Sequence, residues 1–236
     1  MLITIDQGVY KLKNCIIVGM NKLMPWIAGL IVILGLAGIV LLSQSAKTDV
    51  TDTAKLLEVK ETDWAVGPAE VAVTLIEYSD FQCPACKEYY PVLRLLEEEF
   101  PTSLRVVYRH FPLTSHPNAT PAARAAEAAG VQGKFWEMHD ILFNQQDEWR
   151  DNADPRIHFG VYAGELGMDV EQFVGDMLST EIQKKVANDY RDGVILNVQG
   201  TPTFFLNGEK IGNPLSYENF KKVIESKVGT TTPPQG

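Results

Sequence analysis

The fold is decided by the stretch Val71-Ala-Val-Thr-Leu-Ile-Glu-Tyr-Ser-Asp80, which continues directly into Phe81-Gln-Cys-Pro-Ala-Cys86. Its first ten residues are rich in β-branched and apolar side chains, and this composition predicts a buried strand. Between Lys87 and Phe100, apolar residues recur at helical spacing among charged ones, so we expect an amphipathic helix there. Pro84 then falls in the first turn of that helix, where its missing N–H leaves no hydrogen bond unmade.

The two cysteines of this segment are expected to differ in reactivity. Cys83 would stand at the helix N-terminus, where such a position lowers a cysteine pKa from about 8.5 to roughly 3.5–7.5. Cys86 follows one turn later on the same side of the helix, close enough to form a disulfide. We therefore predict that Cys83 is the exposed attacking thiol and Cys86 the buried resolving thiol. For an isolated Cys-x-x-Cys motif, half of a zinc site and an inert pair are the alternative interpretations.

The residues after this helix predict a second strand and then a long helical stretch. Leu104-Arg-Val-Val-Tyr-Arg-His-Phe111 also predicts a strand, so strand, helix and strand suggest a βαβ unit with parallel strands. Cap and turn residues divide residues 114–198 into several helices, and a hairpin around Asn207-Gly208 and a final helix over 216–227 follow. The sequence therefore predicts an α/β fold with a helical insertion at about 114–198. We interpret the aromatic residues of this insertion mainly as helix core: Phe135, Trp136, Phe143 and Trp149.

Two segments together resemble the DsbA-like branch of the thioredoxin superfamily: Leu75-Ile-Glu-Tyr-Ser-Asp-Phe-Gln-Cys-Pro-Ala-Cys86 and Gly200-Thr-Pro-Thr-Phe-Phe-Leu-Asn-Gly208. The resemblance covers about residues 62–228, and membrane-tethered disulfide oxidoreductases with a Cys-Pro-x-Cys site are the most similar. It implies a thioredoxin-like fold with an inserted helical domain. It also implies protein-disulfide oxidoreductase activity through Cys83 and Cys86, with no cofactor beyond their redox-active disulfide.

The resemblance further implies a substrate-binding set around the motif. Pro202 matches a cis-proline that faces the active-site sulfurs, and Thr201 before it matches a position that tunes sulfur reactivity. Pro84 and Ala85, within the motif, complete the expected set. Ala85 departs from the His that strongly oxidising members often carry, so the motif by itself does not imply a strongly oxidising potential.

Glu77 matches a buried acid beneath the motif in this superfamily. A carboxyl with a raised pKa in that position could relay the proton of the resolving thiol. The alternative interpretation is a strand glutamate that points to solvent. His110 and His116 flank a segment similar to one in the family, and they either line the active-site face or make ordinary hydrogen bonds.

The N-terminal region predicts attachment to a membrane. Residues 25–42 are 18 positions without a charged or strongly polar side chain, and about that number crosses a bilayer core of roughly 30 Å. We predict a cytoplasmic segment at 1–24 and an uncleaved transmembrane signal-anchor at 25–42; cleavage after the span and a start at Met20 are the alternatives. A linker over 43–65, a DsbA-type domain over 66–228 and a disordered tail over 229–236 complete the organisation.

Charge and chemistry together limit the function classes. Residues 43–236 carry 18 Lys+Arg and 29 Asp+Glu, a net charge of −11, which disfavours nucleic acid as a partner. The preferred hypothesis is a membrane-anchored oxidase with its catalytic domain on the extracytoplasmic side. It would exchange disulfides with exported, cysteine-containing proteins, and a membrane quinone-linked thiol oxidase would reoxidise it. The alternatives are a disulfide reductase or isomerase of the same fold, and a non-enzymatic, membrane-tethered peptide-binding or chaperone module.

Overall fold

The computed structural model of the chain describes residues 53–229. The cytoplasmic segment predicted for residues 1–24, the membrane span predicted for 25–42 and the tail after residue 229 therefore lie outside the described residues. Within residues 53–229, no helix is both long enough and apolar enough to cross a membrane.

A five-stranded sheet forms the centre of the described fold, with strand order β1-β3-β2-β4-β5. Strands β2 and β3 are parallel, and the other three pairings are antiparallel. Both the predicted βαβ unit and the predicted hairpin around Asn207-Gly208 are therefore confirmed. The bounds of the strands are β1 (Trp64–Val66), β2 (Val73–Ser79), β3 (Leu104–His110), β4 (Thr203–Leu206) and β5 (Glu209–Ile211).

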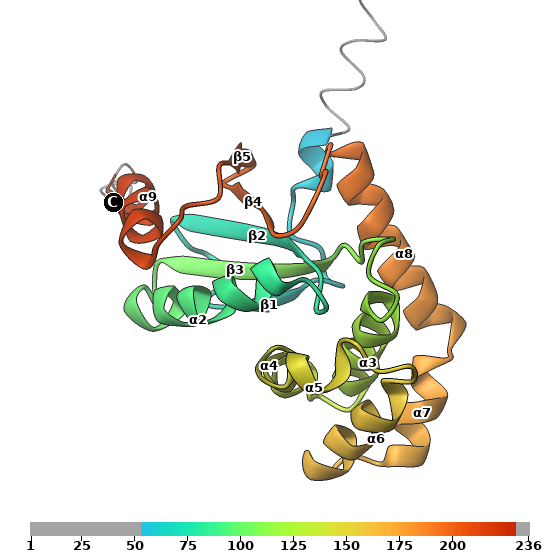
Figure 1. The fold of residues 1–236 in the computed structure, drawn as a ribbon. Coiled ribbons are helices and arrows are strands. Elements are labelled where there is room, and N and C mark those ends of the chain that lie inside the picture. Colours follow the sequence, from blue (N-terminus) through green and yellow to red (C-terminus); the bar gives the residue numbers. More distant parts are fainter. Residues whose placement is uncertain (1–52, 230–236) are drawn as a thin grey trace, which may run out of the picture. The chain divides into compact units, whose positions relative to one another are not determined.

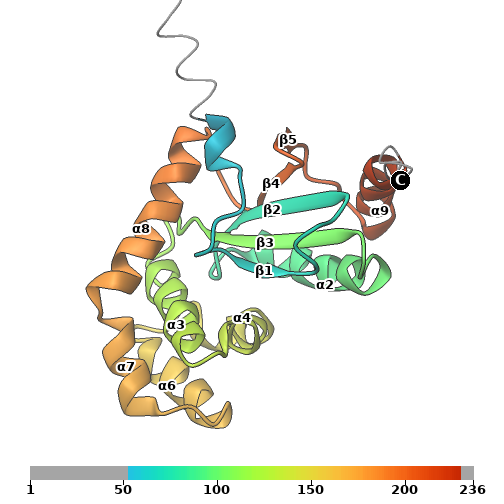
Figure 2. The ribbon, with the colours of Figure 1, turned by 180° about the vertical axis from the view of Figure 1, so that it is seen from behind.

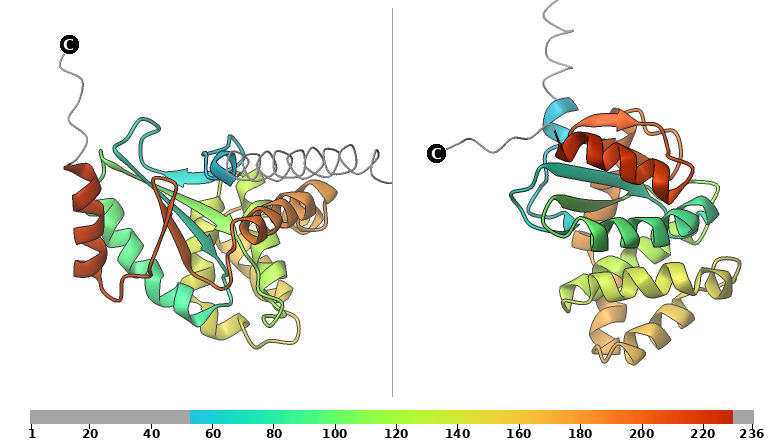
Figure 3. Two further views of the ribbon diagram at one scale, coloured as in Figure 1. Left: turned by 90° about the horizontal axis from the view of Figure 1, so that it is seen from above. Right: turned by 90° about the vertical axis from the view of Figure 1, so that its left-hand side faces the viewer.

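Two helices cover one face of this sheet, namely α2 (Pro84–Glu99) and α9 (Tyr217–Val228). Because side chains alternate along a strand, β2 turns Val73 and Leu75 toward these helices, where they share an apolar cluster with both of them. Helix α9 lies next to α2 (Figure 3). The same alternation carries Glu77, further along β2, onto the face that α2 covers.

The helical insertion predicted at about 114–198 is confirmed between strands β3 and β4 (Figure 1). Its aromatic core is also confirmed, because Phe135, Phe143 and Trp149 are almost completely buried. This core is continuous with Cys83 and Cys86, so the insertion packs directly on the motif. Helix α8 returns the chain to the sheet (Figure 2). The helices are α3 (Ala119–Val131), α4 (Phe135–Asn144), α5 (Gln146–Trp149), α6 (Arg156–Glu165), α7 (Val170–Met177) and α8 (Thr180–Ile195).

A buried arginine of β3 forms hydrogen bonds with the segment that precedes β1. Arg109 of β3 is completely buried, and its Nη2 atom donates to Asp63 Oδ2 at 2.6 Å and to the Glu58 carbonyl at 2.7 Å. Its Nη1 atom donates to the carbonyl of Leu56. The predicted linker over 43–65 therefore overlaps residues that pack on the sheet, including the first two of strand β1.

Candidate active site

The first turn of α2 presents the two cysteines, with Cys83 as the N-cap residue and Pro84 as the first helical residue. Both are free thiols. Cys86 is completely buried, and Cys83 is 6% exposed. Cys83 is thus the more accessible sulfur, as predicted, but it is far less exposed than expected. The Thr201 backbone covers it, with the Thr201 carbonyl oxygen 3.4 Å from Cys83 Sγ.

The surroundings of the two sulfurs move their pKa values in opposite directions. A hydrogen bond from the Cys86 thiol lowers the pKa of Cys83 to about 5 against the opposing effect of burial, and the backbone N–H groups of Ala85 and Cys86 lower it further. Burial raises the pKa of Cys86 well above its usual value, and the neighbouring Cys83 and Glu77 raise it further. At neutral pH the pair therefore consists of a Cys83 thiolate and a Cys86 thiol.

Glu77 lies beneath this pair and is 3% exposed, which rules out the alternative of a solvent-facing strand residue. Burial raises the pKa of its carboxyl to about 8, although a hydrogen bond from Ser79 partly opposes the shift. Ser79 Oγ lies 2.8 Å from Glu77 Oε1, and the same hydroxyl lies close enough to Cys86 to affect its pKa. Ser79 therefore donates a hydrogen bond to the acid and also lies near the buried thiol.

Sequence reasoning did not single out Ser79 as a site residue. The signal that could have found it is its spacing of two residues from Glu77, which places both side chains on the same face of strand β2. A serine hydroxyl that is buried in the core needs a hydrogen-bond partner. The buried acid two residues earlier is that partner.

Strand pairing brings the second predicted motif to the first. Strand β4 runs antiparallel to β2 and pairs Thr203 with Tyr78, so the residues before β4 lie beside the residues after β2. The Thr201–Pro202 peptide bond is cis. Asn213 Nδ2 donates to the Pro202 carbonyl at 2.8 Å and holds this loop from its other side.

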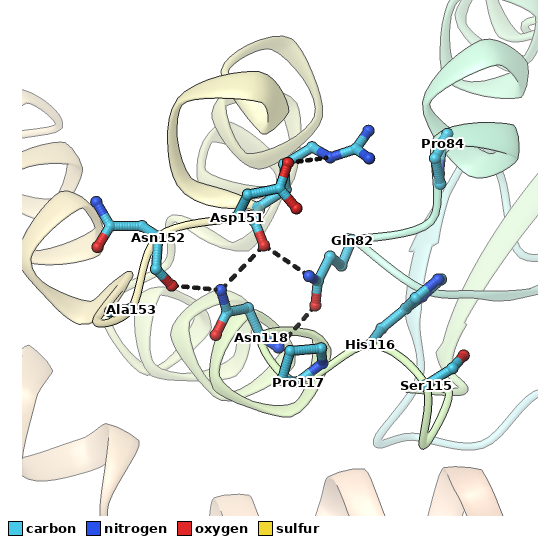
Figure 4. A pocket seen from close by; sticks show the side chains of 10 residues that line it. Gln82, Pro84, Ser115, His116, Pro117, Asn118, Asp151, Asn152 and Ala153 are labelled. Carbon is cyan, nitrogen blue, oxygen red and sulfur yellow. Dashed lines mark hydrogen bonds and ion pairs between the residues drawn. The ribbon is translucent and has the colours of Figure 1, made fainter.

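A polar pocket of about 510 Å³ opens beside the motif, between the thioredoxin-like sheet and the helical insertion. Figure 4 shows that Gln82 crosses to the insertion, where its Nε2 atom donates to the Arg150 carbonyl at 2.6 Å and its Oε1 atom accepts from the Asn118 backbone at 2.6 Å. Pro84 is exposed and lines the same pocket. The lining residues are Gln82, Pro84, Ser115, His116, Pro117, Asn118, Arg150, Asp151, Asn152 and Ala153.

The two histidines near the motif have different surroundings. His116 lines the pocket, and its Nδ1 atom lies 2.7 Å from Asp80 Oδ2, at the end of the strand that precedes the motif. His110 is buried, and its Nε2 atom lies 2.8 Å from Glu127 Oε1. His116 therefore lines the active-site face, whereas His110 belongs to a buried ion-pair cluster.

Metal-ligating side chains gather at one place in the described residues, where His110, Glu127 and Asp189 approach one another. The ammonium group of Lys185 already lies 2.5 Å from Asp189 Oδ2 and 3.9 Å from Glu127 Oε1. The positive charge beside these carboxylates is therefore the ammonium group of Lys185. Within residues 53–229, neither Cys83 nor Cys86 belongs to a group of three or more such side chains.

The five-stranded sheet, the helical insertion and the dithiol at the N-terminus of α2 together define a protein with a thioredoxin-like fold. The chain belongs to the thioredoxin family, whose model matches residues 59–226. Among solved structures, it is similar to α-DsbA1 of Wolbachia pipientis, with a TM-score of 0.67, 22% identity and coverage of 75% of this chain and 96% of that one. A thioredoxin-like oxidoreductase of Silicibacter pomeroyi gives a TM-score of 0.62 with 25% identity, over 73% and 95%.

Curated relatives match the same region within much longer chains. The Na⁺/H⁺ antiporter NhaA 3 of Salinispora tropica is 41% identical over 167 residues, which are 70% of this chain and 25% of that protein. The chain thus spans about a quarter of the length of the curated relatives it matches. The similarity therefore concerns the thioredoxin-like region, and it carries no statement about ion transport.

Proposed function

We propose that this chain is an oxidase that introduces disulfides into exported proteins by exchange with a Cys83–Cys86 disulfide. The observation that carries the proposal is the asymmetry of the two sulfurs, with the pKa of Cys83 lowered to about 5 and that of Cys86 raised. A stabilised Cys83 thiolate favours the reduced enzyme, and a dithiol whose reduced form is stabilised is a stronger oxidant. The Cys86 thiol and the first turn of α2 thus supply stabilisation that the Ala85 side chain cannot give.

The proposed cycle begins with the Cys83–Cys86 disulfide. A substrate thiolate attacks Cys83 Sγ, the bond between the two enzyme sulfurs breaks, and Cys86 leaves as a thiolate that takes up a proton with the help of Glu77. A second substrate thiolate then attacks the substrate sulfur of the mixed disulfide and releases Cys83. The electrons stay on sulfur throughout, so the cycle needs no metal or organic cofactor.

Substrate binding is proposed for the surface around the Cys83 sulfur. Pro84 is exposed and Ala85 is half-buried, while the backbone of Thr201 and Pro202 borders the sulfur on the other side. An extended peptide with a cysteine would lie along this loop, and its neighbouring residues would reach the polar pocket lined by Gln82 and Pro84.

The cellular setting is part of the proposal. Protein disulfides form and persist in oxidising compartments, so we place the catalytic domain outside the cytoplasm, anchored by the span predicted at 25–42. A membrane quinone-linked thiol oxidase would take the electrons from the reduced pair. The domain organisation, with a linker from residue 43 and a DsbA-type domain to residue 228, belongs to the same proposal.

Equilibration of the full-length chain with glutathione buffers tests the direction of the reaction. A reduction potential near about −120 mV supports the oxidase, whereas a value near about −270 mV means that the chain is a reductase. A variant with both Cys83→Ser and Cys86→Ser is the control for enzymatic action. If it retains full activity on a reduced, unfolded substrate, the chain is a peptide-binding module and not an oxidoreductase.

A further inference from the structure

A small cavity lies beside Glu77, between strands β2 and β3 and helices α2 and α4. Its volume of about 10 Å³ is roughly the room that one water molecule needs. Glu77 and Tyr108 line it from the two strands, Glu97 lines it from α2, and His139 lines it from α4. An enclosed cavity with several polar side chains is the kind of site that holds an ordered water.

One polar atom on the wall of this cavity has no partner. Tyr108 is 1% exposed, and its hydroxyl makes no hydrogen bond with any described residue. The Ser79 hydroxyl lies nearby, but it is engaged with Glu77 at 2.8 Å and does not meet hydrogen-bond geometry with Tyr108. A buried hydroxyl without a hydrogen-bond partner destabilises the folded state, and a water in the cavity would remove that penalty.

Glu97 connects the cavity to the protein surface. Its side chain is 13% exposed, and its Oε2 atom lies 2.6 Å from the Nη1 atom of Arg94, whose side chain is 41% exposed. Both residues line the cavity. A proton that reaches Glu97 from the cavity has therefore reached a carboxylate in contact with solvent, whereas Glu77 is itself closed off.

We propose that the proton exchanged by Cys86 travels between Glu77 and solvent through one water in this cavity and through Glu97. The inference rests on the proposed dithiol exchange and adds the route that its proton takes. When the reduced enzyme closes its disulfide, the S–H bond of Cys86 breaks and its proton passes to Glu77. The sulfur bonds to Cys83, the bond from Cys83 to the partner sulfur breaks, and the partner leaves as a thiolate. Glu77 then passes the proton through the water to Glu97.

The charges around the route are compatible with proton transfer near neutral pH. Burial raises the pKa of Glu97 to about 7, with Asp140 and Glu98 adding to the rise and Arg94 opposing it. That value lies next to the pKa of about 8 for Glu77, which the charge of Glu97 also raises. Neighbouring groups of similar pKa exchange protons readily in both directions.

The remaining titratable groups on the cavity wall are unsuited to the same task. Burial lowers the pKa of His139, whose Nδ1 atom is paired with Asp140 Oδ1 at 2.9 Å, so the ring is neutral near pH 7. Burial raises the pKa of Tyr108 and of Tyr90 above their usual range, so neither hydroxyl gives up its proton. Glu97 is the group on this wall that titrates near neutrality and also meets solvent.

A reaction that releases a coloured thiolate in two steps separates the attack by Cys83 from the later attack by Cys86, in which Cys86 loses its proton. The reduced full-length chain is mixed in a stopped-flow instrument with an aromatic disulfide that releases a coloured thiolate. The first release reports attack by Cys83, and the second reports attack by Cys86 on the mixed disulfide. In Glu97→Gln at pH 7.5, where Glu97 is ionised in the parent chain, the first release should keep its rate, while the second should slow about tenfold or more. Added acetate should restore the second rate, because a small acid can replace the lost proton carrier.

Two further variants separate the relay from a structural effect. Glu98→Gln changes an exposed neighbour on the same helix that does not line the cavity, and both releases should keep their rates. Tyr108→Phe removes the hydroxyl that would hold the water, and it should slow only the second release. The inference is overturned if Glu97→Gln leaves the second rate within twofold of the parent, or slows it without rescue by acetate. If the parent chain releases no thiolate in either step, the proposed function itself fails.

Discussion

Replacement of Glu77 by glutamine should stabilise the reduced protein, and the gain should grow with pH. The carboxyl is 3% exposed, and burial raises its pKa from 4.5 to about 8. Below pH 4.5 the side chain is protonated in both the folded and the unfolded chain, so it makes no pH-dependent contribution. Between about pH 4.5 and 8 the unfolded chain releases this proton while the folded chain keeps it, which favours unfolding as the pH rises.

The change in the free energy of unfolding can be estimated from the rise in the pKa of Glu77. Each pH unit above 4.5 costs about 1.4 kcal/mol, so the penalty at pH 7 is about 3 kcal/mol. Glutamine has nearly the same shape and keeps an oxygen that can accept the 2.8 Å hydrogen bond from Ser79. We therefore expect Glu77→Gln to raise the free energy of unfolding by about 2–3 kcal/mol at pH 7, and by much less at pH 5.

Urea unfolding of the full-length, reduced chain at pH 5, 6, 7 and 8 measures this difference. Glu70→Gln, at an exposed position before strand β2, is the matched control and should change stability little at any of these pH values. A Glu77→Gln variant that is less stable than the parent at pH 7, or whose advantage is constant from pH 5 to 8, would refute the reasoning.

Three further substitutions test the packing and a buried ion pair. Gly193→Ala should lower stability by about 1–3 kcal/mol, because a Cβ atom there would lie 2.6 Å from the ring of Phe111. Gly175→Ala, on a helix position with open space around it, should instead stabilise by about 0.5–1 kcal/mol; thermal unfolding of both variants checks the contrast. Asp63→Asn should cost about 3–5 kcal/mol, because it leaves the guanidinium of Arg109 buried without a counter-charge. An unfolding midpoint unchanged in Asp63→Asn would contradict that account.

The parts of the fold that local patterns determine could be predicted from the sequence. Strand β2, the Cys-Pro-Ala-Cys motif and helix α2 follow one another without interruption, so apolar periodicity was sufficient to place them. Strand β1 could not be found in this way, because three residues are too few for a periodic signal. The buried charge of Arg109 was also hidden, since its partner Asp63 lies 46 residues away in the chain.

In the candidate site, too, some residues could be predicted from the sequence and others could be found only in the tertiary fold. Cys83, Cys86 and Glu77 were identified from their spacing and their resemblance to a known family. Glu97 was not, because it opens the run Glu97-Glu98-Glu99, and nothing in the sequence separates it from its neighbours. The tertiary fold separates them, because it places Glu97, partly buried, on the wall of the cavity beside α4 and leaves Glu98 and Glu99 exposed. The low exposure of Cys83 is likewise a tertiary effect of a loop 118 residues later.

The pKa of Cys83 tests most directly the claim that this dithiol is asymmetric. It can be measured in the full-length, reduced chain from the pH dependence of alkylation of Cys83, with Cys86→Ala as the comparison. The account predicts a midpoint near pH 5 for the parent chain, a higher midpoint for Cys86→Ala because the hydrogen bond from Cys86 is lost, and no alkylation of Cys86 in the folded protein. A midpoint near the ordinary cysteine value of about 8.5, or equal alkylation of the two sulfurs, would contradict it.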